Sequence, residues 1–254
     1  MNRVPIQEEE IYKGNLILVN RNHPIKSKVD QATLMPVTET KPTILLERNS
    51  SIMLRELLAA VFANGEIIPV SGYRNHVEQE NIYTNSLKEN GEAFTRKYVA
   101  FPNCSEHQTG LAIDLGQNSE HIDFIRPDFP YYGICQRFRE KAYEYGFIER
   151  YPIHKESITG IGAEPWHFRY VGIWHSLIMK REEKTLEEYI DFLREAEYKN
   201  PYIYQDSYRW IKVFYQKYED GLKELCLTKD LSYEISGNNV DGFIIAVWRM
   251  KYER

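Results

Sequence analysis

Two short segments of the chain bring together residue types that bind metal ions. In the first, SEHQTGLAID, His107 and Asp114 stand seven positions apart, and in the second, EPWH, Glu164 and His167 stand three apart. Imidazole and carboxylate groups are the usual ligands of a catalytic zinc ion, which takes three of them and leaves a further position for water. A glutamate close to a ligand histidine can serve as the base that such water needs. These four residues are therefore the candidates for a hydrolytic metal centre.

The elements around these segments are expected to direct the four side chains toward one cleft. The alternation in LAIDL puts Asp114 on one face of a short strand and its apolar neighbours on the other. A buried aspartate is costly unless it is paired or bound to a metal. His167 lies on the polar face of a second predicted strand, PWHFRYVG, and Pro165 interrupts regular pairing so that Glu164 can turn to the same side. Taken singly, each residue also fits a plain structural role, and the spacing is not a standard one for zinc.

A third motif, SGYR, lies between a predicted strand at 67–70 and a predicted helix at 75–89. The starts of helices commonly bind anions. The guanidinium of Arg74 could fork onto a carboxylate or a developing oxyanion, and Gln79 on the following helix could add an amide donor. Taken alone, the motif is better explained as a tight turn with a solvated arginine.

The remaining pattern predicts one main domain and a different C-terminal part. We expect a strand at 16–19, helices at 50–65 and 136–145, and a long loop at 117–136 that caps the cleft. After about residue 180 an amphipathic helix (184–197) precedes three or four strand-like runs, of which the last two are joined by a turn at 237–242. We therefore predict domains at 1–180 and 181–254.

Composition restricts the class of protein and its location. The net charge is −5 and the sequence has no basic run or arm, so nucleic acid is not an expected partner. The N-terminus has no apolar segment of signal-peptide length and no stretch is long enough to cross a bilayer, so we predict no membrane anchor. The three widely spaced cysteines suggest no disulfide framework. A cytoplasmic location is expected.

Together the three motifs resemble a known family. S-x-H-x-x-G-x-A-x-D spans 105–114, E-x-W-H spans 164–167, and SGYR precedes both in the same order. This set is similar to that of the VanY/VanX zinc D-alanyl-D-alanine peptidases, and closest to the bifunctional VanXY enzymes of glycopeptide (vancomycin) resistance, the vanG type among them. The resemblance covers about residues 10–178.

The resemblance implies a fold, a metal and a set of roles. The fold is α+β of the hedgehog/D,D-peptidase type, with a central antiparallel sheet carrying the zinc site, flanking helices, and here an additional small C-terminal helix and β element. Zn²⁺ would be bound by His107, Asp114 and His167. Glu164 would be the general base and Arg74 would stabilise the oxyanion. Ser105 and Gln79 would hold the substrate, at its C-terminal carboxylate.

The implied substrates are the dipeptide D-Ala-D-Ala and muramoyl pentapeptide precursors. The sequence does not indicate which of the two is preferred. The chain is expected to depart from the family pattern in two ways. It lacks the N-terminal anchor of membrane-bound VanY enzymes, and it has a tail after residue 180. Two roles for this tail are left open, namely oligomerisation and shielding of the cleft.

Three alternatives stay open. The first is a cysteine hydrolase using Cys104 with His107, which would leave Glu164 and His167 without a role. The second is a peptidase of the same fold that cuts another cell-wall bond, such as an endolysin or an L,D-peptidase. The third is a non-catalytic module that binds a cell-wall fragment around a structural zinc, although such zinc usually has four protein ligands.

Overall fold

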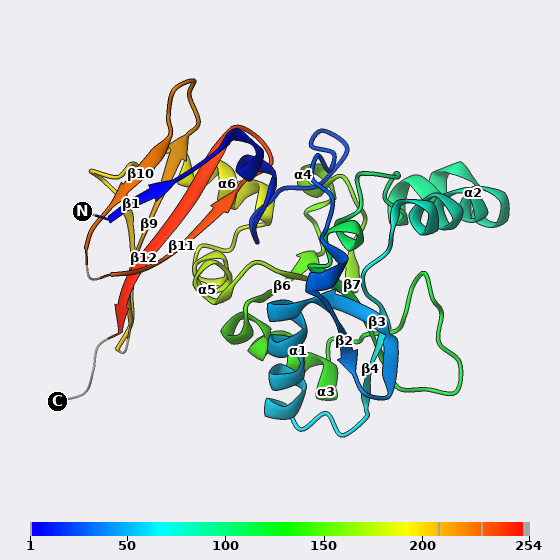
Figure 1. Ribbon diagram of the computed structural model, residues 1–254. Helices are drawn as coiled ribbons and strands as arrows, with labels where there is room; N and C mark the ends of the chain where they lie inside the picture. Colours follow the sequence, from blue (N-terminus) through cyan, green and yellow to red (C-terminus); the bar gives the residue numbers. More distant parts are fainter. Residues whose placement is uncertain (1, 208, 230, 251–254) are drawn as a thin grey trace. The chain divides into compact units, whose positions relative to one another are not determined.

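The chain forms two compact units (Figure 1). The computed structural model describes residues 2–207, 209–229 and 231–250. One unit comprises residues 19–185, and the other joins residues 1–18 to residues 186–254. The first 18 residues thus belong with the C-terminal part and not with a 1–180 domain as predicted. The physical reason is strand pairing, because β1 (Asn2–Pro5) runs antiparallel to β10 (Glu224–Leu227).

The 19–185 unit is built around a four-stranded antiparallel sheet in the order β4-β5-β7-β6, with β2 and β3 forming a separate hairpin. The predicted α+β class with a central antiparallel sheet is confirmed. Its elements are β2 (Leu34–Thr38), β3 (Lys41–Glu47), α1 (Arg48–Ala60), β4 (Ile67–Ser71), α2 (His76–Tyr98), the 3-10 helix η3 (Glu106–Thr109), β5 (Ala112–Gln117), α3 (Gly133–Ala142), β6 (Phe147–Tyr151), α4 (Glu156–Thr159), β7 (Glu164–Tyr170) and α5 (Ile173–Arg181).

One face of the central sheet is apolar, as the alternation in LAIDL predicts. Ile113 and Leu115 are fully buried, and Ile113 pairs in register with Phe168 of β7. The Phe168 ring makes edge-to-face contacts with Phe129 and Phe138, at centroid distances of 5.4 and 5.0 Å. Such pairs stabilise a core beyond the area they bury. The opposite face of the sheet is therefore left for Asp114 and His167.

The helices of this unit follow the predicted apolar patterns with shifted ends. α1 buries Leu54 and Leu57, packs on β2 and β3 and contacts α3, while α3 and α5 contact β6 (Figure 1). The helix predicted at 75–89 is broken at Gly91, whose φ of 81° is not helical, and a further helical segment then continues to Tyr98. The helix predicted at 136–145 begins earlier, at Gly133. The loop predicted at 117–136 is present and runs over 118–132.

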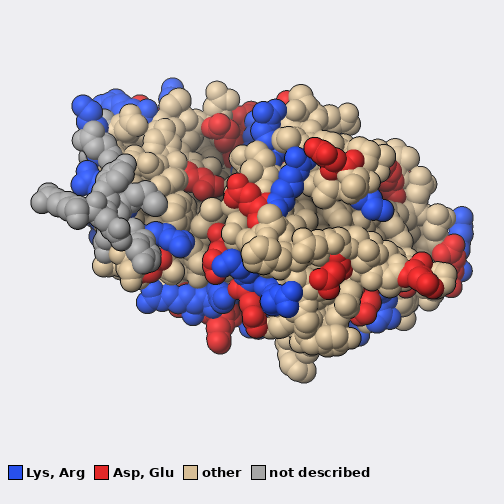
Figure 2. Space-filling view, turned by 90° about the horizontal axis from the view of Figure 1, so that it is seen from below, with Lys and Arg blue, Asp and Glu red and all other residues tan. Residues whose placement is uncertain are grey.

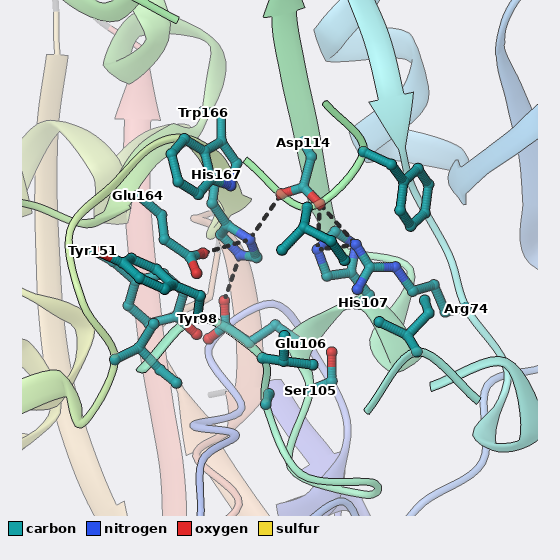
Figure 3. A pocket seen from close by; sticks show the side chains of 16 residues that line it. Arg74, Tyr98, Ser105, Glu106, His107, Asp114, Tyr151, Glu164, Trp166 and His167 are labelled. Carbon is teal, nitrogen blue, oxygen red and sulfur yellow. Dashed lines mark hydrogen bonds and ion pairs between the residues drawn. The ribbon is translucent and has the colours of Figure 1, made fainter. Parts of the chain in front are cut away.

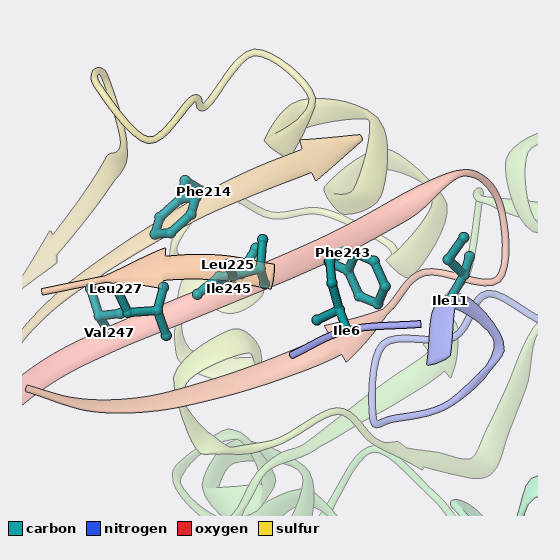
Figure 4. Close-up of a cluster of buried hydrophobic side chains, with 8 residues drawn as sticks. All are labelled: Ile6, Ile11, Phe214, Leu225, Leu227, Phe243, Ile245 and Val247. Carbon is teal, nitrogen blue, oxygen red and sulfur yellow. The ribbon is translucent and has the colours of Figure 1, made fainter. Parts of the chain in front are cut away.

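The other unit is a helix and a set of antiparallel strands, as the C-terminal pattern predicts. Its four-stranded sheet has the order β11-β12-β9-β8, and β11 and β12 form the predicted hairpin. Its core contains Ile6 and Ile11 from the N-terminal segment (Figure 4), so this segment is part of the unit's interior. Besides β1 and β10 the elements are α6 (Leu186–Leu193), β8 (Tyr202–Gln205), β9 (Arg209–Lys217), β11 (Ser232–Gly237) and β12 (Gly242–Met250).

The strand predicted at 16–19 is wrong. This segment is buried, but the amide groups of Leu16 and Leu18 donate to the Ser236 hydroxyl and to the Asn238 carbonyl instead of a strand ladder. An apolar run therefore marks burial here and not strand pairing.

The distribution of surface charge and the character of the helices bear on whether nucleic acid or a membrane is a partner. On the face shown in Figure 2, acidic and basic side chains are interspersed. Among the described residues, none of the helices combines the length and the apolar character that crossing a bilayer requires.

Candidate active site

The sheet itself places two of the predicted metal ligands together. Asp114 on β5 and His167 on β7 are directly paired across the two antiparallel strands, so both side chains project from the same face. Asp114 Oδ1 lies 3.0 Å from His167 Nδ1, and both residues are buried. The two motifs, 53 positions apart in sequence, thus meet through strand register.

The third predicted ligand comes from η3, immediately before β5. This helix ends at Gly110, whose φ is 73° and whose Cβ, if it had one, would lie 2.9 Å from a Leu34 methyl group, so the motif requires glycine there. The turn brings His107 Nε2 to 3.1 Å from Asp114 Oδ2. His107 Nδ1 lies 2.8 Å from the Gly72 carbonyl, which can only accept, so Nδ1 carries the proton and the Nε2 lone pair faces Asp114.

These three side chains fit a divalent metal ion such as zinc. His107, Asp114 and His167 offer ligand atoms that all lie within 4.8 Å of one another, and all three are buried (Figure 3). Two imidazole nitrogens and a carboxylate are a donor set of catalytic zinc sites, and three protein ligands leave one position open. The arrangement therefore matches an open, catalytic site better than a closed, structural one.

Glu164 reaches the same site through an irregularity in strand pairing. Glu164 pairs with Tyr151 of β6 while Phe168 pairs with Glu149, so the register shifts between them. This shift allows Glu164 and His167, three positions apart, to lie on one side, and Glu164 Oε2 is 3.6 Å from His167 Nδ1. Burial raises the pKa of the Glu164 carboxyl to about 8, and the nearby Asp114 carboxylate adds to the rise. A carboxyl with such a pKa is suited to exchange protons near neutral pH.

The pKa values of the ligand side chains are set by burial and by one another. Burial lowers the pKa of His107 to about 4, and the positive charge of Arg74 acts in the same direction. Burial alone would lower the pKa of His167, but its hydrogen bond to Asp114 and the nearby carboxylates of Glu106 and Glu164 outweigh it and raise the pKa to about 9. The histidines likewise keep the pKa of Asp114 well below its usual range despite burial. The aspartate is therefore ionised, as a metal ligand must be.

The SGYR motif brings a cation to the site. Arg74 Nη2 lies 2.7 Å from Asp114 Oδ2, and its Nε donates to the Ser71 hydroxyl at 2.8 Å. Gln79 is fully buried; its carbonyl oxygen accepts from Arg74 at 3.3 Å and its amide donates to the Ala100 carbonyl at 2.8 Å. Gln79 thus contacts Arg74 and is not among the residues that line the cavity, whereas Ser105 lines it.

The three candidate ligands line a cavity of about 40 Å³ together with Arg74 and Glu164, and the long loop closes this cavity on one side. Phe124 and Ile125 of that loop line the cavity, and the Arg74 guanidinium lies 5.7 Å from the centre of the Phe124 ring. Tyr131, further along the same loop, instead donates its hydroxyl to Glu149. Tyr151 and Trp166 form part of the opposite wall (Figure 3).

A buried charge cluster that was not predicted from the sequence lies beside the candidate ligands. Glu106 lies next to His107 in the chain, and its Oε1 accepts from Arg150 Nε at 2.8 Å and is 2.9 Å from Arg169 Nη1. The side chains of all three residues are completely buried. Because they come from η3, β6 and β7, only the folded sheet brings them together. One usable signal in the sequence was Arg169, a charged residue inside the predicted strand PWHFRYVG.

Comparisons with known proteins identify the family of this chain. Residues 43–173 match the family model described as VanY, D-alanyl-D-alanine carboxypeptidase. The bifunctional D-Ala-D-Ala dipeptidase and carboxypeptidase VanXYC of Enterococcus gallinarum is 42% identical over 184 residues, which cover 72% of this chain and 97% of that protein.

Two solved structures are also similar. The vancomycin resistance D,D-dipeptidase VanXYg, in complex with a D-Ala-D-Ala phosphinate analog, has a TM-score of 0.94 at 48% identity and covers 98% of this chain and 99% of its own. A mutant of the D,D-pentapeptidase VanY from a VanB-type resistance cassette, in complex with Zn(II), has a TM-score of 0.59 at 32% identity over 69% of this chain and 98% of its own. The chain therefore belongs to the VanY family of D-alanyl-D-alanine carboxypeptidases.

Proposed function

We propose that this protein is a zinc-dependent D,D-peptidase that hydrolyses D-Ala-D-Ala and removes the terminal D-Ala from muramoyl pentapeptide precursors, and that it thereby confers vancomycin resistance. The observation that carries the proposal is the convergence of His107, Asp114 and His167, with Glu164 beside them, on one buried cavity. The bifunctional activity of VanXYC and the D-Ala-D-Ala phosphinate analog bound to VanXYg support the substrate class.

The proposed reaction assigns one role to each side chain. A zinc ion held by the three ligands would polarise the scissile carbonyl and make water a stronger nucleophile. Glu164 takes the proton from the attacking water and passes it to the leaving amine, and its raised pKa favours both transfers. The Arg74 guanidinium stabilises the negative charge that develops on the carbonyl oxygen. Tyr151 and Trp166 exclude bulk water from the cavity.

The substrate-binding roles are part of the same proposal. Ser105, which lines the cavity, would bind the C-terminal carboxylate of the substrate. Gln79 would contribute through its contact with the Arg74 guanidinium, which it holds in place. The catalytic machinery would lie entirely within residues 19–185, and residues 186–254 would have a separate role.

We further propose that the enzyme works in the cytoplasm on soluble precursors. The three cysteines are all unpaired in the structure, which accords with a reducing compartment. Fractionation of cells that express the protein, with enzyme activity measured in the soluble and envelope fractions, tests this location.

The test of the activity is release of D-alanine. Zinc-loaded protein is incubated separately with D-Ala-D-Ala, with UDP-muramoyl pentapeptide and with a muramoyl tetrapeptide that ends in an L,D bond. Release from the first two substrates, abolished by chelation and restored by zinc, is the expected result. Release from the tetrapeptide alone would replace the proposal with an L,D-peptidase, and no release from any of them would leave a binding role.

The matched variant is Glu164→Ala. Because Glu164 is not one of the three ligands, the variant should retain zinc, whereas loss of general base catalysis should lower turnover by at least about 10²-fold. Turnover at a tenth of the wild-type rate or more would contradict the assigned role. Resistance is tested by expressing wild type and variant in a susceptible host and comparing the vancomycin concentrations that stop growth.

A further inference from the structure

Each candidate ligand histidine has an inner ring nitrogen, which faces Asp114 and the proposed metal site, and an outer ring nitrogen, which points away from it. The two histidines differ in the group that faces the outer nitrogen. For His107 this nitrogen is Nδ1, and it donates to the Gly72 carbonyl at 2.8 Å. For His167 the inner nitrogen is Nδ1, at 3.0 Å from Asp114, so the outer nitrogen is Nε2. A ligand histidine usually donates its outer N–H to a carbonyl or carboxylate, which fixes the tautomer and the ring orientation.

The group that faces the outer nitrogen of His167 is a carboxylate oxygen. Glu106 Oε2 lies 3.6 Å from His167 Nε2. Both atoms are buried, and neither has a hydrogen-bond partner among the residues that the structure describes. Two unpartnered buried polar atoms that face each other are costly unless they bond to one another. A small rotation of either side chain brings the pair into hydrogen-bonding range.

The two buried arginines hold this carboxylate in place. Arg150 and Arg169 both interact with Oε1 of Glu106, which leaves Oε2 directed at His167 (Figure 3 shows the Glu106–His167 pair). A buried glutamate needs such compensation, because an unpaired buried charge is strongly unfavourable. Arg169 lies two positions beyond His167 on β7, so the strand that carries the ligand also carries part of the clamp on its partner.

We propose that Glu106 is a positioning residue for the metal centre, whose Oε2 accepts the Nε2–H of His167 and thereby directs the Nδ1 lone pair at the metal. This inference rests on the proposed metal site but not on any substrate. The proposal states which tautomer of the His167 imidazole is present. With Nε2 protonated, Nδ1 is free to bind a cation, whereas with Nδ1 protonated it cannot.

The direct test is nitrogen NMR of the metal-loaded wild-type protein, which needs no variant to fold. In protein labelled with ¹⁵N at histidine and loaded with ¹¹³Cd²⁺, we expect His167 to show metal coupling at Nδ1 and a slowly exchanging proton on Nε2. Metal coupling at Nε2, or an Nε2 without a proton, would overturn the proposal.

The mutational test is Glu106→Gln. The amide keeps the shape, but when its oxygen accepts from the arginines its NH₂ group faces His167 and favours a lone pair on Nε2, the wrong tautomer. Loss of such an outer partner typically weakens metal binding by about 10–100-fold, and competition with a chromophoric chelator measures this for zinc. Zinc affinity within about threefold of wild type would refute the proposal, whatever the peptidase activity.

Glu149→Gln is the matched control. Glu149, on β6, is likewise a carboxylate with a largely covered side chain that is paired with an arginine, Arg139, and the partners that the structure describes for it, Arg139 and Tyr131, include no ligand histidine. Both variants therefore lose a buried ion pair, and only Glu106→Gln presents a donor to His167. We expect Glu149→Gln to bind zinc as wild type does. An equal loss of zinc affinity in both variants would show a general effect of destabilisation and overturn the assignment.

Discussion

Replacing Arg74 with lysine tests how the site stabilises developing charge. The guanidinium is held by the Ser71 hydroxyl at 2.8 Å, by the Gln79 carbonyl at 3.3 Å and by Asp114 Oδ2 at 2.7 Å. A lysine ammonium keeps the charge but lacks the planar fork, so it cannot keep these three contacts and still present a donor to the substrate. The substitution therefore removes orientation rather than charge.

The expected magnitude follows from the role. Loss of one preorganised donor to an oxyanion typically lowers kcat by about 10²–10³-fold, or about 2.7–4 kcal/mol of transition-state stabilisation. Because the oxyanion exists only in the transition state, kcat and kcat/KM for Arg74→Lys should fall together, with KM changed by a small factor. Zinc content should not change, because none of the three ligands is altered.

The assay is D-alanine release under saturating and limiting D-Ala-D-Ala, with metal content measured on the same samples. Arg55→Lys serves as the control, because Arg55 is exposed and donates to the Val37 carbonyl, away from the cavity. A fall in kcat of less than about tenfold would refute oxyanion stabilisation by Arg74. A rise in KM at constant kcat would instead assign Arg74 to ground-state binding of the substrate carboxylate.

Two further predictions concern stability. Phe138→Ala removes a fully buried ring that contacts Phe129 and Phe168. The free energy of unfolding measured by urea titration should therefore fall by about 3–5 kcal/mol, and a loss under about 1 kcal/mol would contradict the place of Phe138 in the core. Gly237→Ala would place a methyl group against the Ile11 carbonyl and should destabilise the unit of residues 1–18 and 186–254 by about 1–3 kcal/mol. Hydrogen exchange in β11 and β12 should then become faster. Unchanged exchange there would refute the close approach of Gly237 to the Ile11 carbonyl.

The sequence was informative wherever a local pattern decides the structure. The alternation in LAIDL separated Asp114 from the buried Ile113 and Leu115, and the fold keeps that division. Leu54 and Leu57 marked the buried side of α1. The candidate metal ligands could be named for the same reason, because imidazole and carboxylate side chains retain their chemistry in any fold.

What the tertiary structure decided depends on segments that are far apart in the chain. Strand register, not spacing, sets Asp114 opposite His167, and the register shift between β6 and β7 brings Glu164 to the same face. Glu106 is an ordinary polar residue in the sequence, and only the sheet surrounds it with Arg150 and Arg169.

The boundary of the units shows the same limit. The apolar run at 16–19 was predicted to be a strand of the main domain, but Leu16 bonds to Ser236 in β11 and Leu18 to Asn238 just after it, and β1 pairs with β10. A short apolar segment reports that it will be buried but not against which partner, because that choice is made by contacts more than 200 positions away in the chain. The sequence by itself determined the chemistry of the site and the faces of its elements, and the tertiary structure determined their pairing and the supporting charges, since both depend on long-range register.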